Sequence, residues 1–189
     1  SAMSVVLVPA LANDLEINAG LFGIIIAIPG AVTILFEILL ASLSDNTGRK
    51  PIMMIGIAAG ILGALSLAWE PNQSFLFIFS FLFGLANVFF FPSALAYLSQ
   101  SVKNEEHARI QGVNGFVQGI AFAVGAWAAG VLGTQFTFRV VLVSIAVILT
   151  ICLLFILMIK EQKKDQDRSQ HNLLREITQT YQSVFQLLR

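Results

Sequence analysis

Long apolar blocks alternate with short polar segments along most of this chain. The blocks with almost no charge occupy about residues 19–41, 52–69, 75–98, 110–132 and 139–159. A helix needs about 20 mainly apolar residues to cross the hydrocarbon core of a bilayer, and each block approaches that length. A shorter apolar stretch, 1–11, contains Pro9 and is too short to span. The pattern predicts an all-α membrane protein with six transmembrane helices, of which the first is truncated.

Basic residues fall on alternate connections between these blocks. Ten of the eleven Lys and Arg residues lie after the second and fourth helices and in the tail after the sixth: Arg49, Lys50, Lys103, Arg109, Lys160, Lys163, Lys164, Arg168, Arg175 and Arg189. Arg139 alone falls on the other side. Because Lys and Arg mark the cytoplasmic side of membrane proteins, we expect a multi-pass protein of the plasma membrane with these basic segments in the cytoplasm.

Composition agrees with a lipid-embedded chain and argues against other classes of protein. Of the 189 residues, 57% are hydrophobic and 12% are charged, against about 45–50% and about 25% in soluble domains. The formal net charge is zero, which gives no basis for nucleic-acid binding. The one cysteine, Cys152, lies in an apolar block, and His107 and His171 are far apart. We therefore expect no metal site, no cofactor and no enzyme activity.

The segment between the second and third helices, 41–50, reads A-S-L-S-D-N-T-G-R-K. Gly48 allows the backbone to turn tightly, while Asp45 ends one helix and Arg49 and Lys50 begin the next. An acid and two bases at the membrane surface can pair with a neighbouring helix end, and can so hold one conformation closed and release another. A simpler interpretation is that Arg49 and Lys50 only fix the orientation of the chain.

This segment resembles the signature that the major facilitator superfamily carries between its second and third helices. The matching residues are Asp45, Gly48, Arg49 and Lys50, with Ala41 where the family usually has Gly. The resemblance extends through helix order and loop lengths over about 1–160. It implies the N-terminal six-helix half of a twelve-helix transporter that works by alternating access. It also implies that Asp45 forms a conformational latch with the C-terminal six-helix half.

The chain divides into two parts on this interpretation. Residues 1–160 form the N-terminal transmembrane bundle, and residues 161–189 form a cytoplasmic linker. The linker begins with a charged run and continues, from Leu174 to Leu188, with apolar residues at spacings of three and four. That spacing predicts an amphipathic helix that lies in the membrane interface or under the bundle. We expect it to lead to a second half that is absent from this sequence.

Two further segments are similar to the family but depart from its drug exporters. Many proton-coupled exporters have Arg at the position of Ser80. The glycine-rich fifth helix resembles the family's fifth helix, but no Pro follows Gly130, so the antiporter form of its motif is absent. Its glycines predict close helix crossing and sliding, or close packing alone: Gly115, Gly119, Gly125 and Gly130.

Glu37 is the most informative polar residue inside a predicted span. A charged carboxylate in the bilayer centre costs about 2.5–3.5 kcal/mol, and its own segment offers no basic partner. It precedes Asp45 by about 12 Å along a helix. We expect Glu37 to bind a coupling proton or a cationic substrate. The alternative is a protonated carboxyl group that hydrogen-bonds to a neighbouring helix.

Other candidates for the substrate pathway lie on the fourth and fifth helices: Ser80, Asn87, Phe91, Tyr97, Asn114 and Gln118. The polar side chains can equally bond between helices, and the aromatic ones can face lipid. We expect proton-coupled efflux of hydrophobic or cationic small molecules, with H⁺ as the coupling ion and the lipid bilayer as surroundings. The alternatives are a nutrient or metabolite permease of the same superfamily, or a non-transporting helper or sensor module.

Overall fold

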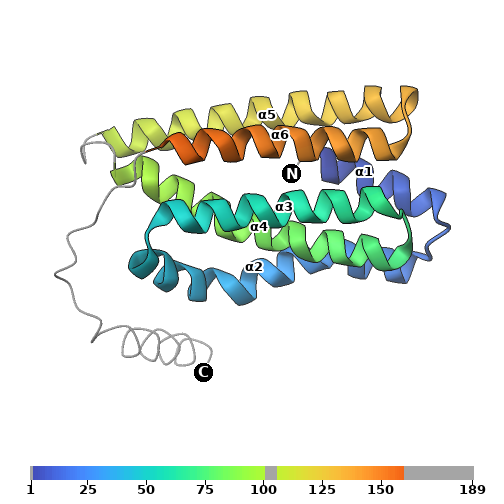
Figure 1. The fold of residues 1–189 in the computed structure, drawn as a ribbon, viewed down its shortest axis with the longest axis horizontal. Coiled ribbons are helices and arrows are strands. Elements are labelled where there is room, and N and C mark those ends of the chain that lie inside the picture. The colour runs from blue at the N-terminus through green and yellow to red at the C-terminus, as the bar shows by residue number, and fades with distance from the viewer. Residues whose placement is uncertain (1, 101–105, 160–189) are drawn as a thin grey trace.

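The computed structural model describes residues 2–100 and 106–159 of the 189 in the chain. All regular secondary structure in these ranges is helical, as predicted. The helices are α1 (Ala2–Asp14), α2 (Ala19–Thr47), α3 (Arg49–Trp69), α4 (Gln73–Gln100), α5 (His107–Gln135) and α6 (Phe138–Met158). They run side by side in alternating directions (Figure 1). The predicted linker, 161–189, lies outside the described residues.

The five helices from α2 to α6 are each long and apolar enough to cross a membrane. α1 has 13 residues, which extend about 20 Å at about 1.5 Å per residue. The hydrocarbon core is about 30 Å thick, so α1 as described is too short to span it.

The connections between helices fall at two opposite ends of the bundle (Figure 1). One end, here called the Gly48 end, holds the junction of α2 with α3, the start of α5 and the end of α6. The other, here called the Glu70 end, holds the connections that follow α1, α3 and α5. Of the described basic residues, Arg139 alone lies at the Glu70 end. The fold therefore has the alternation that the positions of the basic residues predict.

The junction between α2 and α3 is shorter than predicted. The sequence suggests a charged loop over 42–51, but α2 continues to Thr47 and α3 begins at Arg49. The loop prediction is wrong because polar residues beyond an apolar block can stay helical, with their backbone groups paired. Gly48 alone connects the helices, with φ 92° and ψ 158°. Glycine is essentially the only residue found in that backbone region, so the reversal of the chain depends on it.

Asparagine side chains begin the two helices that follow short turns at the Glu70 end. Asn18 Oδ1 accepts a hydrogen bond of 2.9 Å from the backbone N–H of Leu21, and Asn72 Oδ1 accepts one of 3.0 Å from that of Phe75. Asn is among the preferred residues at helix N-termini because its side chain pairs with an otherwise unbonded backbone donor. These caps fix where α2 and α4 begin.

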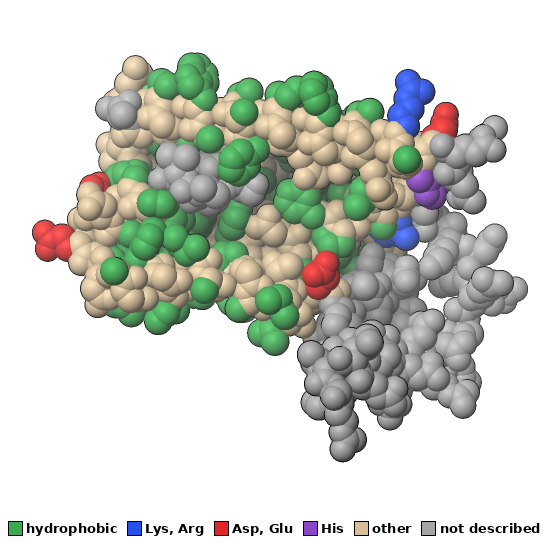
Figure 2. All heavy atoms as spheres, turned by 180° about the vertical axis from the view of Figure 1, so that it is seen from behind, with side chains coloured by type: hydrophobic (Ala, Val, Ile, Leu, Met, Phe, Trp, Pro, Cys, Tyr) green, Lys and Arg blue, Asp and Glu red, His purple; other side chains and the backbone are tan. Residues whose placement is uncertain are grey.

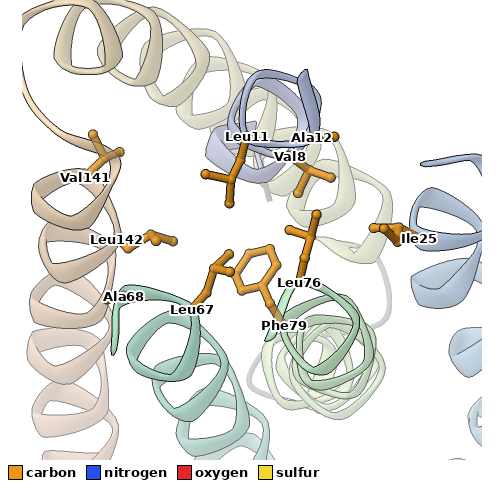
Figure 3. Packing of buried hydrophobic residues seen from close by; sticks show 10 residues of the cluster. All are labelled: Val8, Leu11, Ala12, Ile25, Leu67, Ala68, Leu76, Phe79, Val141 and Leu142. Carbon is orange, nitrogen blue, oxygen red and sulfur yellow. The ribbon is translucent and has the colours of Figure 1, made fainter. Parts of the chain in front are cut away.

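The most deeply buried part of the bundle surrounds α1 (Figure 3). Leu11 of α1 is 2% exposed, and Leu67 of α3 and Leu76 of α4 are fully buried. α6 adds Val141 and Leu142, which are also fully buried. The side chains in Figure 3 point from these helices into one shared space. Although it is short, α1 therefore anchors the Glu70 end of the bundle.

Glycines bring α3 and α2 into close contact with α4. A Cβ atom added to Gly56 of α3 would lie 2.9 Å from Phe89 Cβ and 3.0 Å from the backbone nitrogen of Phe90. A Cβ atom added to Gly84 of α4 would lie 2.9 Å from Pro29 Cα on α2. Such distances leave no room for a methyl group, so these glycines set the separation of the helices.

The sequence places the packing glycines on α5 instead. A Cβ atom at Gly115, Gly119 or Gly130 would meet no atom within 4 Å, and Gly125 is half-buried. Among the described side chains of α5, only Ala129 is buried. Gly115, Gly119 and Gly130 therefore contact no neighbouring helix among the described residues.

Replacing Gly84 with Ala is expected to lower the stability of the protein by about 1–3 kcal/mol, the usual cost of overpacking a close contact. The new methyl group would meet backbone atoms of α2, which cannot rotate away as a side chain can. Gly23→Ala on α2 is the matched control, because a Cβ atom there has nothing within 4 Å. Thermal unfolding in detergent measures both variants. A Gly84→Ala variant as stable as Gly23→Ala would contradict the close contact.

Candidate functional site

The α2–α3 junction holds the predicted latch residues close together along the chain. Asp45 lies in the last turn of α2, and Arg49 and Lys50 are the first two residues of α3. Arg49 and Lys50 are half-buried. The side chain of Asp45 lies outside the described part of the structure, so its pairing stays a prediction.

Lys50 is bonded to α6 within the same bundle. Its Nζ donates hydrogen bonds of 2.9 Å to the backbone oxygen of Leu157 and 2.8 Å to that of Ile159. These carbonyls stand at the C-terminal end of α6, where a helix leaves acceptors unpaired and carries partial negative charge. Lys50 therefore stabilises the end of α6, a role that the latch motif does not suggest.

Three of the pathway candidates share one face of α4. Ser80, Asn87 and Phe91 follow each other at spacings of seven and four, so they point the same way as Gly84 between them. Ser80 is 3% exposed and Phe91 is 38% exposed. This face changes from buried to open on going from the Glu70 end toward the Gly48 end.

Asn87 lies near the middle of α4 and is half-buried. Its Nδ2 donates a hydrogen bond of 2.7 Å to the backbone oxygen of Phe83, one turn earlier in the same helix. A bond within its own helix satisfies part of the amide without using a neighbouring helix. The side-chain oxygen of Asn87 can still accept a hydrogen bond at mid-membrane depth.

Tyr97 does not join this face. It packs against the cluster of Met53, Ile57 and Ile156, between α3 and α6. Helical spacing agrees, since Tyr97 lies six residues after Phe91 and points to a different side of α4. This packing gives Tyr97 a structural contact in the bundle, and its place in the pathway stays a prediction.

The two candidates on α5 have different surroundings. Asn114 is half-buried and lines an open cavity of about 430 Å³ at the Gly48 end, with Leu98 of α4 on the opposite wall. Arg109 and Glu106 stand at the same cavity. Gln118, one turn beyond Asn114, is exposed. The cavity is largely apolar, with its polar groups near the start of α5.

Glu37 lies on a side of α2 that no other described helix covers. It is exposed, as is Ile34, which is 76% exposed, and a Cβ atom at Gly30 would meet nothing within 4 Å. α2 contacts α4 through a different face, at Pro29 and Val32. The structure therefore does not bring Glu37 together with the candidates on α4.

Arg139 is the one basic residue that the sequence places on the side opposite the other ten Lys and Arg residues. In the structure its Nε donates to the backbone oxygen of Ala68 at 2.9 Å, and its Nη2 donates to that of Trp69 at 3.0 Å. These carbonyls end α3. Hydropathy and the positions of the basic residues do not predict this contact, because they do not show which helices are neighbours.

Comparison with known proteins agrees with this fold. The family model described as Major Facilitator Superfamily matches residues 1–188. The chain belongs to this superfamily. Both the resemblance drawn from residues 41–50 and the predicted all-helical fold are thereby confirmed, and the chain is an integral membrane protein.

Three curated relatives are similar to this chain. The class H tetracycline resistance protein of Pasteurella multocida is 26% identical over 153 residues, which are 78% of this chain and 38% of the relative. Citrate exporter 1 of Yarrowia lipolytica is 25% identical over 166 residues, 85% of this chain and 24% of the relative. The uncharacterised transporter YwfA of Bacillus subtilis is 28% identical over 136 residues, 70% of this chain and 33% of the relative. The chain thus spans well under half the length of each relative.

Proposed function

We propose that this chain forms the N-terminal half of a plasma-membrane transporter that exports hydrophobic or cationic small molecules in exchange for protons by alternating access. Its partner in the transport cycle is a C-terminal six-helix half, and its Gly48 end faces the cytoplasm. Membership of the superfamily carries the general proposal, and a tetracycline resistance protein among the relatives supports export.

The distribution of charge supports the substrate class. Along α2 to α6, Glu37 is the only charged residue more than one turn from a helix end. Hydrophobic side chains are spread along the length of the bundle on the face shown in Figure 2, and the Lys, Arg and His side chains visible there stand at one end. Arg139 lies at the other end. An anionic substrate would find no cation at mid-membrane depth among the described helices. A neutral or cationic substrate is compatible with an acidic and aromatic environment.

The pathway proposed on this side of the transporter runs along the face of α4 that carries Ser80, Asn87 and Phe91. Ser80 is buried, and Gly84, which points the same way, packs against Pro29 of α2. The open part of this face is therefore the end that carries Asn87 and Phe91. Asn114 contributes from α5, where it lines the cavity at the Gly48 end. Gln118 lies one turn further on α5 and is exposed.

Proton movement in everted vesicles that contain the natural protein tests the proposal. Vesicles are energised until their interior is acidic, and tetracycline, lipophilic cations and neutral drugs are added one at a time. An exchanger releases protons from the vesicle as it takes up its substrate. We expect release with at least one lipophilic compound and none from vesicles without the protein. No release with any lipophilic compound would contradict proton-coupled export of this class.

A metabolite exporter of the same superfamily is the second candidate, favoured by the relative named citrate exporter 1. Citrate carries several negative charges, so on this candidate the cations that bind it must come from outside the described helix interiors. Adding citrate to the same vesicles separates the two functions. Transport of citrate with no response to lipophilic compounds would favour the second candidate over the first.

A further inference from the structure

α3 and α6 are joined at both of their ends by the same arrangement. At the Gly48 end, Lys50 near the start of α3 donates to the last carbonyls of α6, at Leu157 and Ile159. At the Glu70 end, Arg139 near the start of α6 donates to the last carbonyls of α3, at Ala68 and Trp69. Each helix therefore supplies a cation to the C-terminus of the other.

The arrangement has a physical reason in the helix dipole. Lys50 and Arg139 are each the second residue of a helix, where the positive end of the dipole disfavours a cation. The C-terminus of an antiparallel neighbour offers unpaired carbonyls and the opposite partial charge at the same membrane depth. Each cation thus relieves an unfavourable position on its own helix by bonding to the other.

The two helices are matched in length, so both contacts form together. α3 and α6 each contain 21 residues, about 31 Å at about 1.5 Å per residue, close to the thickness of the hydrocarbon core. Between the ends, a Cβ atom at Gly60 of α3 would lie 3.2 Å from Leu149 Cδ1 of α6, so the helices approach closely at mid-length. Contact therefore runs along the whole pair.

We propose that Lys50 and Arg139 pin α3 to α6 at both membrane faces, each by donating hydrogen bonds to the C-terminal carbonyls of the other helix, and that these bonds keep the two helices at a fixed separation. Lys50 and Arg139 are positioning residues in this pair of helices. Lys50 also holds the place where the chain leaves α6, because one of its acceptors is Ile159, directly after the last residue of that helix. The proposal does not depend on the direction of transport or on the substrate.

Spin-label distance measurements on the natural protein in bilayers test this proposal without any transport assay. Cys152 is first replaced by Ser, and labels are placed on exposed side chains of both helices. Ile55 and Leu154, at 52% and 56% exposure, report the Gly48 end; Leu65 and Val143, at 45% and 42%, report the Glu70 end. In the otherwise unchanged protein, both pairs should give one narrow distance that stays the same at mildly acidic and mildly alkaline pH.

The variants assign each pin to its end. Lys50→Met should about double the width of the distance distribution between Ile55 and Leu154 and leave the other pair unchanged, since a lost cation frees the carbonyls it held. Arg139→Met should about double the width of the distance distribution between Leu65 and Val143 and leave the Ile55–Leu154 pair unchanged. Lys50→Arg keeps donors and charge and should behave as the parent. Arg109→Met is the matched control, because Arg109 is a cation at the Gly48 end outside this pair.

Two results would overturn the proposal. Several distances, or a distance that changes with pH, in the parent protein would show that α3 and α6 move separately. Unchanged widths in both Lys50→Met and Arg139→Met would show that the hydrogen bonds do not hold the pair. If a methionine variant fails to insert, the parent distances still decide whether the two helices keep a fixed separation.

Discussion

Gly48→Ala is expected to lower stability by about 1–3 kcal/mol and to reduce transport strongly, because the backbone at this position is one that only glycine adopts readily. Its φ of 92° and ψ of 158° would bring an alanine Cβ atom against the neighbouring peptide group. No other residue separates α2 from α3, so the strain cannot spread into a loop. The chain would relax by unwinding the adjacent turns that carry Asp45 and Arg49.

Gly48→Asn gives the sharper version of this test. Asparagine tolerates the left-handed helical region, in which ψ is about 30–60°, but the ψ of Gly48 lies far outside it. We therefore expect Asn to be no better than Ala here. Gly23→Ala within α2 is the control, with open space around its Cβ position. Thermal unfolding and transport rates measure all three, and a stable, active Gly48→Asn variant would contradict the backbone geometry.

The sequence predicts the helices well and their ends less well. Apolar blocks of about 20 residues have few alternatives to spanning helices in lipid, since an unpaired backbone costs several kcal/mol per group. Hydropathy does not record where a helix stops, however, and α2 continues through its polar residues to Thr47. Gly48 could be identified from sequence as the turn because it is the only glycine between the second and third helical blocks, in residues 42–51.

Contacts between helices could not be read from composition. α3 and α5 both carry several glycines, yet Gly56 and Gly60 face a neighbouring helix while Gly115 and Gly119 face open space. Which face of a helix is covered depends on the positions of the other helices, which a single sequence does not give. The same limit explains why Arg139 looked like an exception rather than a hydrogen-bond donor to α3.

Helical spacing alone could have separated the pathway candidates on α4 into two groups. Ser80, Asn87 and Phe91 recur at seven and four residues, whereas Tyr97 falls out of that series. The structure places Tyr97 against α3 and α6 and leaves Phe91 partly open. What spacing does not supply is the depth of burial along the shared face, which distinguishes Ser80 from Phe91.

Glu37→Gln is expected to abolish proton release on substrate addition, with a fall of at least about tenfold, the factor that about 1.4 kcal/mol of lost interaction gives. Glutamine keeps the shape and hydrogen-bonding capacity of a protonated glutamic acid but cannot take up or release a proton. Glu37 is the one charged residue at this depth in the described helices, so no other charged side chain there can replace it.

Exchange of substrate across the membrane separates a proton-binding role from a structural one. With equal proton concentrations on both sides, labelled substrate exchanges without net proton movement, so a variant defective only in coupling still exchanges it. We expect Glu37→Gln to keep this exchange and lose proton release. Glu16→Gln is the matched control, because Glu16 is exposed and lies outside the helices at the Glu70 end. It should retain both activities.

The surroundings of Glu37 make unchanged proton release in Glu37→Gln equally informative. Its side of α2 is open within the described residues, and an unpaired carboxylate there would cost about 2.5–3.5 kcal/mol in lipid. A proton on Glu37, or a partner from the other half of the transporter, removes that cost. If Glu37→Gln leaves proton release unchanged but lowers the thermal stability, Glu37 bonds to the second half and the coupling proton binds elsewhere. Loss of proton release with unchanged stability assigns the proton to this carboxyl group.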